Sequence, residues 1–156
     1  MSRALTAVVV VVVALGAASV WAQTDPAVGT WKMNPAKSKY DPGPVPKSNT
    51  IVITAAGNSL KVSAKGVDGA GKPTSTDYTV ATDGKDVPVK GPAAYDSVSA
   101  RRIDPNTTEL TRKKGGKVVQ TATRAVSSDG KTMTVTATGT DEKGRKIHTV
   151  SVFEKQ

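Results

Sequence analysis

Closely spaced turn signals divide the chain after residue 23 into short threonine- and valine-rich runs. Glycine, proline, asparagine and aspartate dominate such turns because they tolerate or pre-set the backbone angles that a turn needs. The signals are Gly57-Asn58, Asp68-Gly69, Asp83-Gly84, Gly91-Pro92, Asp104-Pro105-Asn106, Gly115-Gly116, Asp129-Gly130 and the segment 141–144. The runs between them are long enough for strands and too short for most helices, so the pattern predicts an all-β fold.

Composition and alternation support this prediction. Residues 23–156 contain 19 threonines and 15 valines but only two leucines, and β-branched side chains favour a pleated surface over a helix. Met133, Val135 and Ala137 alternate with threonines, as expected for antiparallel strands with one buried face. The expected strands are 29–33, 49–56, 59–67, 74–82, 86–90, 96–103, 107–113, 117–127, 131–140 and 145–155.

These strands, joined by short connections, predict a single antiparallel up-and-down meander of about ten strands. A flat meander exposes two strand edges, whereas closure into a barrel removes them. We therefore expect a closed or nearly closed β-barrel. A two-sheet β-sandwich is the alternative.

The first 22 residues resemble a secretory signal peptide. Arg3 is followed by an apolar stretch from Ala4 to Ala18, and Val20-Trp21-Ala22 suits a cleavage site before Gln23. We expect residues 1–22 to be removed, leaving residues 23–156 as a single β-barrel domain, periplasmic or extracellular, without a transmembrane segment. An N-terminal membrane anchor is the alternative. The chain has no cysteine, so strand pairing and packing must stabilise the domain without disulfides.

Basic residues exceed acidic ones by nine over the full chain and are spread along it. Scattered lysines beside acidic neighbours are typical of a solvated surface, and export argues against a nucleic-acid partner. The densest cluster is Arg112-Lys113-Lys114 with Lys117. We interpret it as a soluble loop tip, with contact to an anionic envelope component as the alternative. We expect a monomer.

The proline-rich segment 34–47 interrupts the regular spacing of strands. Four prolines over these residues exclude a central strand or a helix of any length, so the segment should run extended over the surface. Tyr40 is its only large apolar anchor. The segment either covers the end or flank of the barrel or forms a lid beside a ligand entrance.

The two ends of residues 23–156 resemble the calycin group, which includes lipocalins and fatty-acid-binding proteins. Gly29-Thr30-Trp31 is similar to the motif that begins such barrels, and Phe153-Glu154-Lys155 is similar to the last strand of fatty-acid-binding proteins. The opening GTWKMNPAKSKYDPGP and the hairpin SSDGKTMTVT also resemble small exported bacterial proteins described as lipocalin-like or uncharacterised. The resemblance implies a barrel that could hold an apolar or amphiphilic ligand, with Trp31 in its core.

The chain departs from fatty-acid-binding proteins at the residues that hold the ligand. Those proteins have a helix pair after the first strand, where this chain has its proline-rich segment. Ser151 and Phe153 occupy the positions of the arginine and tyrosine that bind the carboxylate, and Arg124 lies near a second inward arginine of that family. If Arg124 points inward it needs a partner or an anionic ligand, because an isolated buried charge is costly. We favour the outward orientation. The candidate ligand-binding residues are Arg124, Ser151, Phe153 and Tyr40.

No catalytic or metal-binding pattern is evident. His148 is the only histidine and has no cysteine or carboxylate at metal-ligand spacing, so it is interpreted as a surface residue. A lone histidine also leaves no convincing catalytic triad. We predict no enzyme, cofactor or metal site. The favoured function is a non-catalytic exported binding protein with a small apolar or amphiphilic ligand; the alternative is a packed barrel acting through its surface as an envelope interaction or inhibitor protein.

Overall fold

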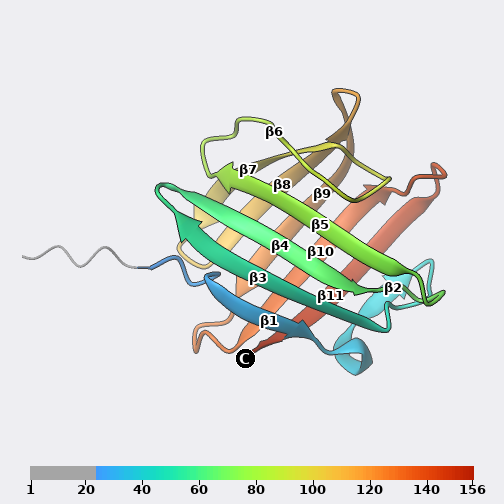
Figure 1. The fold of residues 1–156 in the computed structure, drawn as a ribbon, viewed down its shortest axis with the longest axis horizontal. Helices are drawn as coiled ribbons and strands as arrows, with labels where there is room; N and C mark the ends of the chain where they lie inside the picture. Colours follow the sequence, from blue (N-terminus) through green and yellow to red (C-terminus); the bar gives the residue numbers. More distant parts are fainter. Residues whose placement is uncertain (1–23) are drawn as a thin grey trace, which may run out of the picture.

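A computed structural model describes residues 24–156, and they form one antiparallel sheet of eleven strands (Figure 1). The strands are β1 (Gly29–Met33), β2 (Lys39–Asp41), β3 (Ser48–Ala56), β4 (Ser59–Val67), β5 (Pro73–Ala81), β6 (Val87–Pro88), β7 (Ser97–Asp104), β8 (Thr107–Lys114), β9 (Lys117–Val126), β10 (Thr132–Thr140) and β11 (Lys146–Lys155). The prediction of an all-β meander of about ten strands is confirmed. The expected signal peptide and Gln23 lie outside the described residues.

The sheet curls into a nearly closed barrel. Its strand order is β5-β4-β3-β1-β11-β10-β9-β8-β7-β6, so the first and last strands of the chain pair with each other. The remaining gap between β5 and the edge formed by β6 and β7 is bridged by backbone pairing of Asp77 with Lys90 and of Asp83 with Arg101. In Figure 1, β1, β3, β4 and β5 form the near wall and cross over the other strands behind them. The barrel was therefore the correct prediction, rather than the sandwich.

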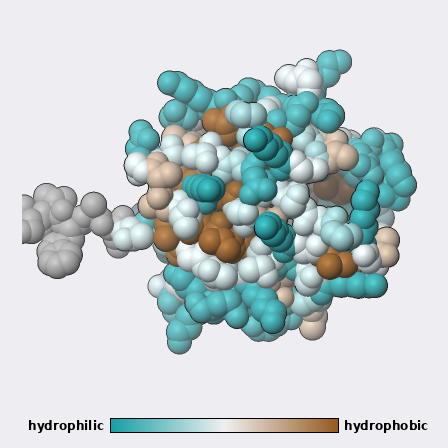
Figure 2. All heavy atoms as spheres, in the orientation of Figure 1, coloured by the Kyte–Doolittle hydropathy of each residue, from teal (hydrophilic) through white to brown (hydrophobic). Residues whose placement is uncertain are grey.

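Side chains alternate between the barrel interior and the outer surface. On β9 the inward residues are Gln120, Ala122, Arg124 and Val126, all of which are buried. Figure 2 shows hydrophilic side chains spread over the outer face, with apolar atoms visible only in separate patches. Along residues 24–156, no helix is long and apolar enough to cross a membrane.

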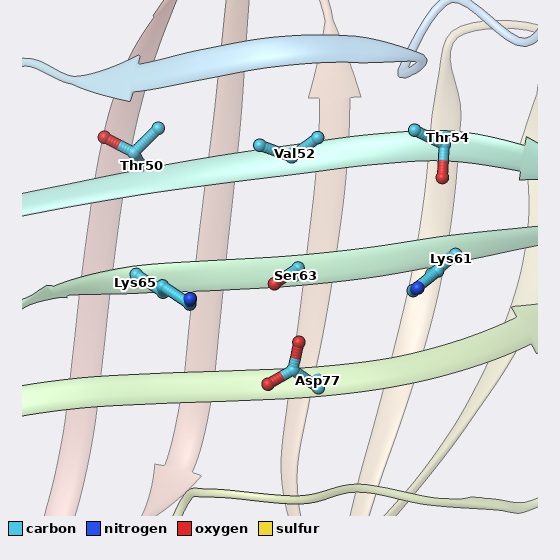
Figure 3. Close-up of a pocket in the computed structure, with 7 residues that line it drawn as sticks. All are labelled: Thr50, Val52, Thr54, Lys61, Ser63, Lys65 and Asp77. Atoms are coloured by element: carbon cyan, nitrogen blue, oxygen red, sulfur yellow. The ribbon is translucent and has the colours of Figure 1, made fainter.

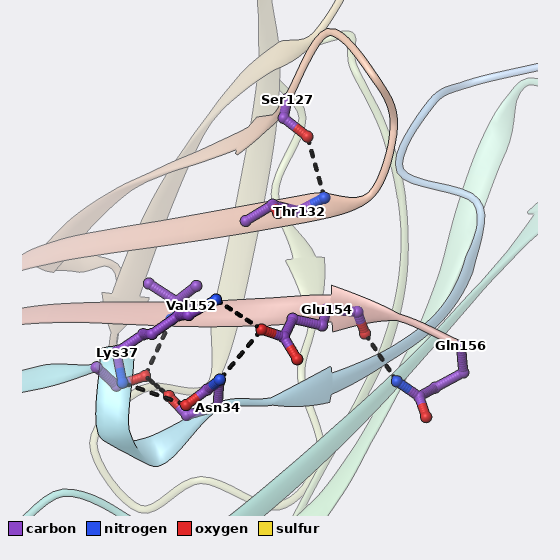
Figure 4. Close-up of polar contacts among 8 residues, drawn as sticks. Asn34, Lys37, Ser127, Thr132, Val152, Glu154 and Gln156 are labelled. Atoms are coloured by element: carbon purple, nitrogen blue, oxygen red, sulfur yellow. Dashed lines mark hydrogen bonds and ion pairs between the residues drawn. The ribbon is translucent and has the colours of Figure 1, made fainter.

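The proline-rich segment first pairs with β11 and then reaches the turn between β4 and β5, where Pro44 lies against Gly69. It contains a three-residue 3-10 turn, Pro35–Lys37, and β2, whose residue Tyr40 pairs with Thr149 of β11. Asn34 Nδ2 and Lys37 Nζ donate hydrogen bonds of 3.1 and 2.9 Å to Glu154 Oε1 (Figure 4). The expectation of a surface segment is met, but the expectation that it lacks any helical turn was wrong, because Asn34 caps a short turn that begins at Pro35.

Candidate functional site

One end of the barrel is filled. Trp31, Met133 and Phe153 lie in a core that reaches Val126 and Leu60, and Trp31 is fully buried, as predicted. The short segment before β1 covers this end: the Trp31 indole nitrogen donates a 2.8 Å hydrogen bond to the carbonyl oxygen of Ala27. We call this the closed end.

The closed end is further held by an ion pair between Asp25 and Arg102 of β7. Asp25 also accepts a hydrogen bond from the backbone nitrogen of Ala27, which fixes the turn that leads into β1. The first described residues therefore cover this end of the barrel.

The opposite half of the barrel holds a pocket of about 150 Å³. Strands from all around the barrel contribute to its wall. Its polar and aromatic lining residues include Tyr40, Asn49, Tyr78, Tyr95, Arg112 and Ser151. We call this the open-end pocket. The interior is therefore neither empty nor completely packed.

Three of the four candidate residues named from the sequence line this pocket. Tyr40 reaches it from β2, and its phenol oxygen lies 2.6 Å from the hydroxyl oxygen of Ser151 on β11. Phe153, two residues further along β11, also lines the pocket and packs into the core of the closed end. The spacing of two residues places Ser151 and Phe153 on the same face of the strand.

Arg124 points into the barrel, so the favoured outward orientation was wrong. Its residue is 4% exposed, and it sits between Thr108 of β8 and Val135 of β10 in the sheet register. Its strand partner Val135 lines the pocket, whereas Arg124 itself is not among the lining residues. The Arg124 Nη2 atom is buried without a hydrogen-bond partner. Arg124 shares the inward alternation of Gln120 and Ala122 along β9, and this alternation overrides the general tendency of arginine to be exposed.

Arg112 is a site residue that the sequence analysis missed. It was placed in a soluble loop-tip cluster, but its side chain turns inward while Lys114 and Lys117 are exposed. Its guanidinium lies 4.9 Å from the centre of the Tyr95 ring, within the range of a cation–π contact. Arg112 lies two residues after Leu110 and four after Thr108 on β8, so all three side chains face inward. This alternation could have identified Arg112 from the sequence.

Gln120 holds Arg112 in place. The Arg112 Nη1 atom donates a 3.0 Å hydrogen bond to Gln120 Oε1, and Gln120 Nε2 donates a 2.9 Å bond to the carbonyl oxygen of Thr140. Gln120 is buried, so its amide is fully oriented by these two contacts. The guanidinium is thus fixed at the side of the pocket rather than free in solvent.

Two tyrosines of the pocket are held neutral. Burial raises the pKa of Tyr78, although the nearby positive charges of Arg124 and Arg112 oppose this effect. Burial also raises the pKa of Tyr40, opposed by its hydrogen bond with Ser151 and by the charge of Arg112. Both phenols therefore remain available as hydrogen-bond donors at neutral pH.

A second depression lies on the outer face of β3, β4 and β5. Figure 3 shows its side chains, which are the outward-facing partners in the strand alternation: Thr50, Val52, Thr54, Lys61, Ser63, Lys65 and Asp77. Their side chains stand apart on the outer surface of the sheet. The open-end pocket is the better candidate site, because side chains from several strands surround it.

His148 is exposed and pairs with Asp41 in the β2–β11 ladder. Within the part of the chain that the structure covers, no three histidine, cysteine, aspartate or glutamate side chains gather to hold a metal ion.

Comparison of the sequence with protein-family models and with curated proteins gives no match. Solved structures do match the fold. Rv2717c from M. tuberculosis superposes with a TM-score of 0.54 at 14% identity, covering 84% of this chain and 93% of that one. Zebrafish ileal bile acid-binding protein, solved with cholic acid, superposes with a TM-score of 0.52 at 11% identity, covering 84% of this chain and 99% of that one. The chain thus has a calycin-type barrel fold.

Proposed function

We propose that this chain is a non-catalytic binding protein that holds a small amphiphilic ligand in its open-end pocket. The observation that carries the proposal is the open-end pocket itself, in which Tyr95, Arg112 and Ser151 share a wall with apolar side chains. A cavity with a few convergent polar groups is the usual form of a small-molecule site. The bile acid-binding neighbour supports a ligand-holding role for a barrel of this shape.

The pocket has both an apolar wall and polar groups, which an amphiphilic ligand needs. Ile51, Val62, Val135 and Phe153 supply apolar wall, and burying ligand surface against them contributes about 25 cal/mol per Å². Asn49, Ser151 and the tyrosines supply hydrogen-bonding groups that orient a polar end.

Native mass spectrometry of the protein purified from its own host tests the proposal. We expect a small molecule to remain bound under gentle ionisation and to be lost when the protein is denatured. Several preparations without any co-purifying molecule would count heavily against a carrier.

The proposal includes export to the periplasm or the extracellular space, as for the small bacterial lipocalin-like proteins that the sequence resembles. The support is the three-part N-terminal pattern, with cleavage before Gln23. Intact-mass measurement of the protein from the envelope or medium should give the mass of residues 23–156. A chain that keeps residues 1–22 in the cytoplasm would contradict this part.

A second candidate is a barrel that acts through its surface. The filled closed end favours it, because the space occupied by this core is not available to a ligand. Lys114 and Lys117, exposed at the β8–β9 turn, could contact an anionic envelope component. Retention of the wild type, but not of a Lys114→Gln, Lys117→Gln double variant, on an anionic polymer would favour this function.

A further inference from the structure

The barrel wall is interrupted between β2 and β3, in the half that holds the open-end pocket. β1 joins β3 to β11 only along Gly29–Met33, beside the closed end. Further along β11 its partner is β2, which pairs with no other strand among residues 24–156. The facing residues of β3, Ser48 and Asn49, pair with β4. Within the described part of the chain, no backbone ladder therefore connects β2 with β3.

The proline-rich segment spans this break. Its middle part is β2, and residues 42–47 then lead across to the turn between β4 and β5. Pro44 lies so close to Gly69 that a side chain at that glycine would overlap it. The backbone nitrogen of Lys47 donates a 2.9 Å hydrogen bond to the carbonyl oxygen of Val67. The end of the segment is thus attached to β4.

The open-end pocket lies directly behind the break. Tyr40 of β2 and Ser151 of β11 line it from one side, whereas Asn49 and Ile51 of β3 line it from the other. Tyr40 and Val45 of the proline-rich segment also pack against the neighbouring core. Moving these two side chains outward would connect the pocket with solvent through the side of the barrel.

Few contacts hold β2 on the barrel. It pairs with β11 along Lys39–Asp41, whereas β10 pairs with β11 along the whole of Thr132–Thr140. The 2.6 Å contact between Tyr40 and Ser151 is the side-chain hydrogen bond that joins β2 to the interior. Segments with few buried contacts open locally at a lower free energy than the whole fold. β2 can therefore detach while the rest of the sheet stays paired.

The turn before β2 provides a fixed point for such a movement. The backbone nitrogen of Val152 donates a 3.0 Å hydrogen bond to Ser38 Oγ, and the side chains of Asn34 and Lys37 donate to Glu154. These contacts keep residues 34–38 beside β11. The movable part is thus limited to residues 39–46, with an attachment at each end.

The volume of the pocket indicates why this part should move. Ligand pockets usually measure about 300–1,000 Å³, whereas this one measures about 150 Å³. A cavity of about 150 Å³ holds one benzene-sized ring. Withdrawal of the Tyr40 ring would make room for a larger amphiphile as well as open a path to it.

We infer that residues 39–46 form a lateral gate. β2 leaves β11 and carries Tyr40 outward, the ligand enters between β2 and β3, and renewed pairing of β2 closes the wall. Proline fixes its own backbone φ, so Pro42, Pro44 and Pro46 favour movement as one stiff piece. The inference rests on the proposed function and adds how its site is entered.

A reversible disulfide tests the gate. The chain has no cysteine, so two introduced cysteines have no competing partner. Asp41 and His148 are exposed and directly opposite in the β2–β11 ladder. Opposite residues of antiparallel strands have Cα atoms about 4.5–5.5 Å apart, which a disulfide can bridge. The double variant Asp41→Cys, His148→Cys therefore ties β2 to β11 when oxidised and leaves the pocket lining unchanged.

The matched control shares one of the two cysteines. Thr138 of β10 is exposed and lies opposite His148 on the other side of β11. The double variant Thr138→Cys, His148→Cys thus forms a disulfide between two strands that are already paired, without touching the proline-rich segment.

Stopped-flow fluorescence measures uptake of N-phenyl-1-naphthylamine, a neutral probe larger than one ring whose emission rises in apolar surroundings. We expect oxidation to slow uptake by the 41–148 variant about tenfold or more, because local opening is then blocked. Reduction should restore the rate, and the 138–148 control should be insensitive to oxidation. Equal rates for the oxidised and reduced 41–148 variant, or equal slowing of both variants, would overturn the gate.

Hydrogen exchange followed by mass spectrometry tests the movement without any ligand. We expect amides in residues 36–47 to exchange about tenfold faster or more than those of β1, which pairs with the same strand β11. Oxidation of the 41–148 variant should remove this difference. Equal protection of the two segments in the wild type would show that β2 does not detach.

Failure of the gate can be told apart from failure of the proposed function. A molecule that co-purifies from the host, together with probe uptake that oxidation does not change, overturns only the gate. No co-purifying molecule and no probe uptake by any form of the protein overturn the carrier, and the gate with it.

Discussion

The phenol oxygen of Tyr40 and the hydroxyl oxygen of Ser151 lie 2.6 Å apart, joining the proline-rich segment to the inner face of β11. Tyr40 is the large anchor of a segment that follows β11, and Ser151 is buried at the wall of the open-end pocket. The contact thus fixes Tyr40 against the wall of the pocket. In this chain the proline-rich segment stands where fatty-acid-binding proteins have a helix pair.

We expect Tyr40→Phe to lower the free energy of unfolding by about 0.5–1.5 kcal/mol, the usual contribution of one hydrogen bond. Ser151→Ala should have a similar effect, and the double variant should cost less than the sum, because both changes remove the same contact. Urea unfolding of the four proteins gives the coupling energy. Strict additivity would show that the contact contributes nothing.

Arg124→Met should raise the stability of the unliganded protein by about 1 kcal/mol or more. The substitution replaces a buried charge that has no acidic partner with an apolar side chain of similar length. The midpoint of thermal unfolding measures the change, with Arg101→Met on the outer surface as the control. A lower midpoint for Arg124→Met would mean that the guanidinium stabilises the empty barrel.

Tyr78 should make the fold sensitive to alkaline pH. Burial raises its pKa above the ordinary value near 10, so the folded state favours the protonated phenol. Its contribution is therefore fully present below pH ~10 and is lost as the pH rises through the higher pKa of the folded state. Urea midpoints between pH 8 and 11 should fall more steeply for the wild type than for Tyr78→Phe. Parallel curves would contradict this prediction.

The pKa of the Glu154 carboxyl should depend on its contacts with the short turn at Pro35–Lys37. Hydrogen bonds from Lys37 and Asn34, with the charge of Lys37, lower the pKa of the Glu154 carboxyl. Its contribution to stability is present above the unfolded pKa and is lost as the pH falls through the folded one. Lys37→Met should move the pKa of Glu154 upward in an NMR titration, whereas Lys39→Met, on the exposed side of β2, should leave it unchanged.

Trp31 should be the most sensitive core position. It is fully buried and its indole nitrogen is bonded to Ala27, so Trp31→Ala should cost about 3–5 kcal/mol in unfolding free energy. Denaturant titration followed by circular dichroism measures the loss. Trp31→Phe is the milder comparison, since it keeps most of the ring volume. A cost below 1 kcal/mol for the alanine variant would show that the closed end is not packed as described.

Most of the strands could be predicted from the sequence, because turn chemistry and alternation are local properties. The hairpin β10–β11 follows from alternating Met133, Val135 and Ala137 and from the turn near Asp141. β2 could not be predicted, since three residues within a proline-rich segment give no alternation, and they become a strand only because β11 offers them backbone partners.

Part of the pocket lining was named from the sequence. Tyr40, Ser151 and Phe153, named as ligand-binding candidates, line the open-end pocket, but the orientation of Arg124 was wrong and Arg112 was assigned to a loop tip. Both errors concern arginines. The alternation of residues along β8 and β9 indicates that these two side chains face the interior. The general tendency of arginine to face water outweighed that parity.

The sequence by itself determined where the strands begin and end, because glycine, proline and aspartate restrict the backbone within a few residues of the chain. Only the tertiary structure decided which strands meet where the sheet closes, how the core around Trp31 is filled, and that Arg112 and Arg124 both face the interior. Those outcomes depend on contacts between residues far apart in the chain, such as Trp31 with Ile51 and Lys155 in neighbouring strands. Local backbone preferences do not determine how much interior space remains once such strands have paired.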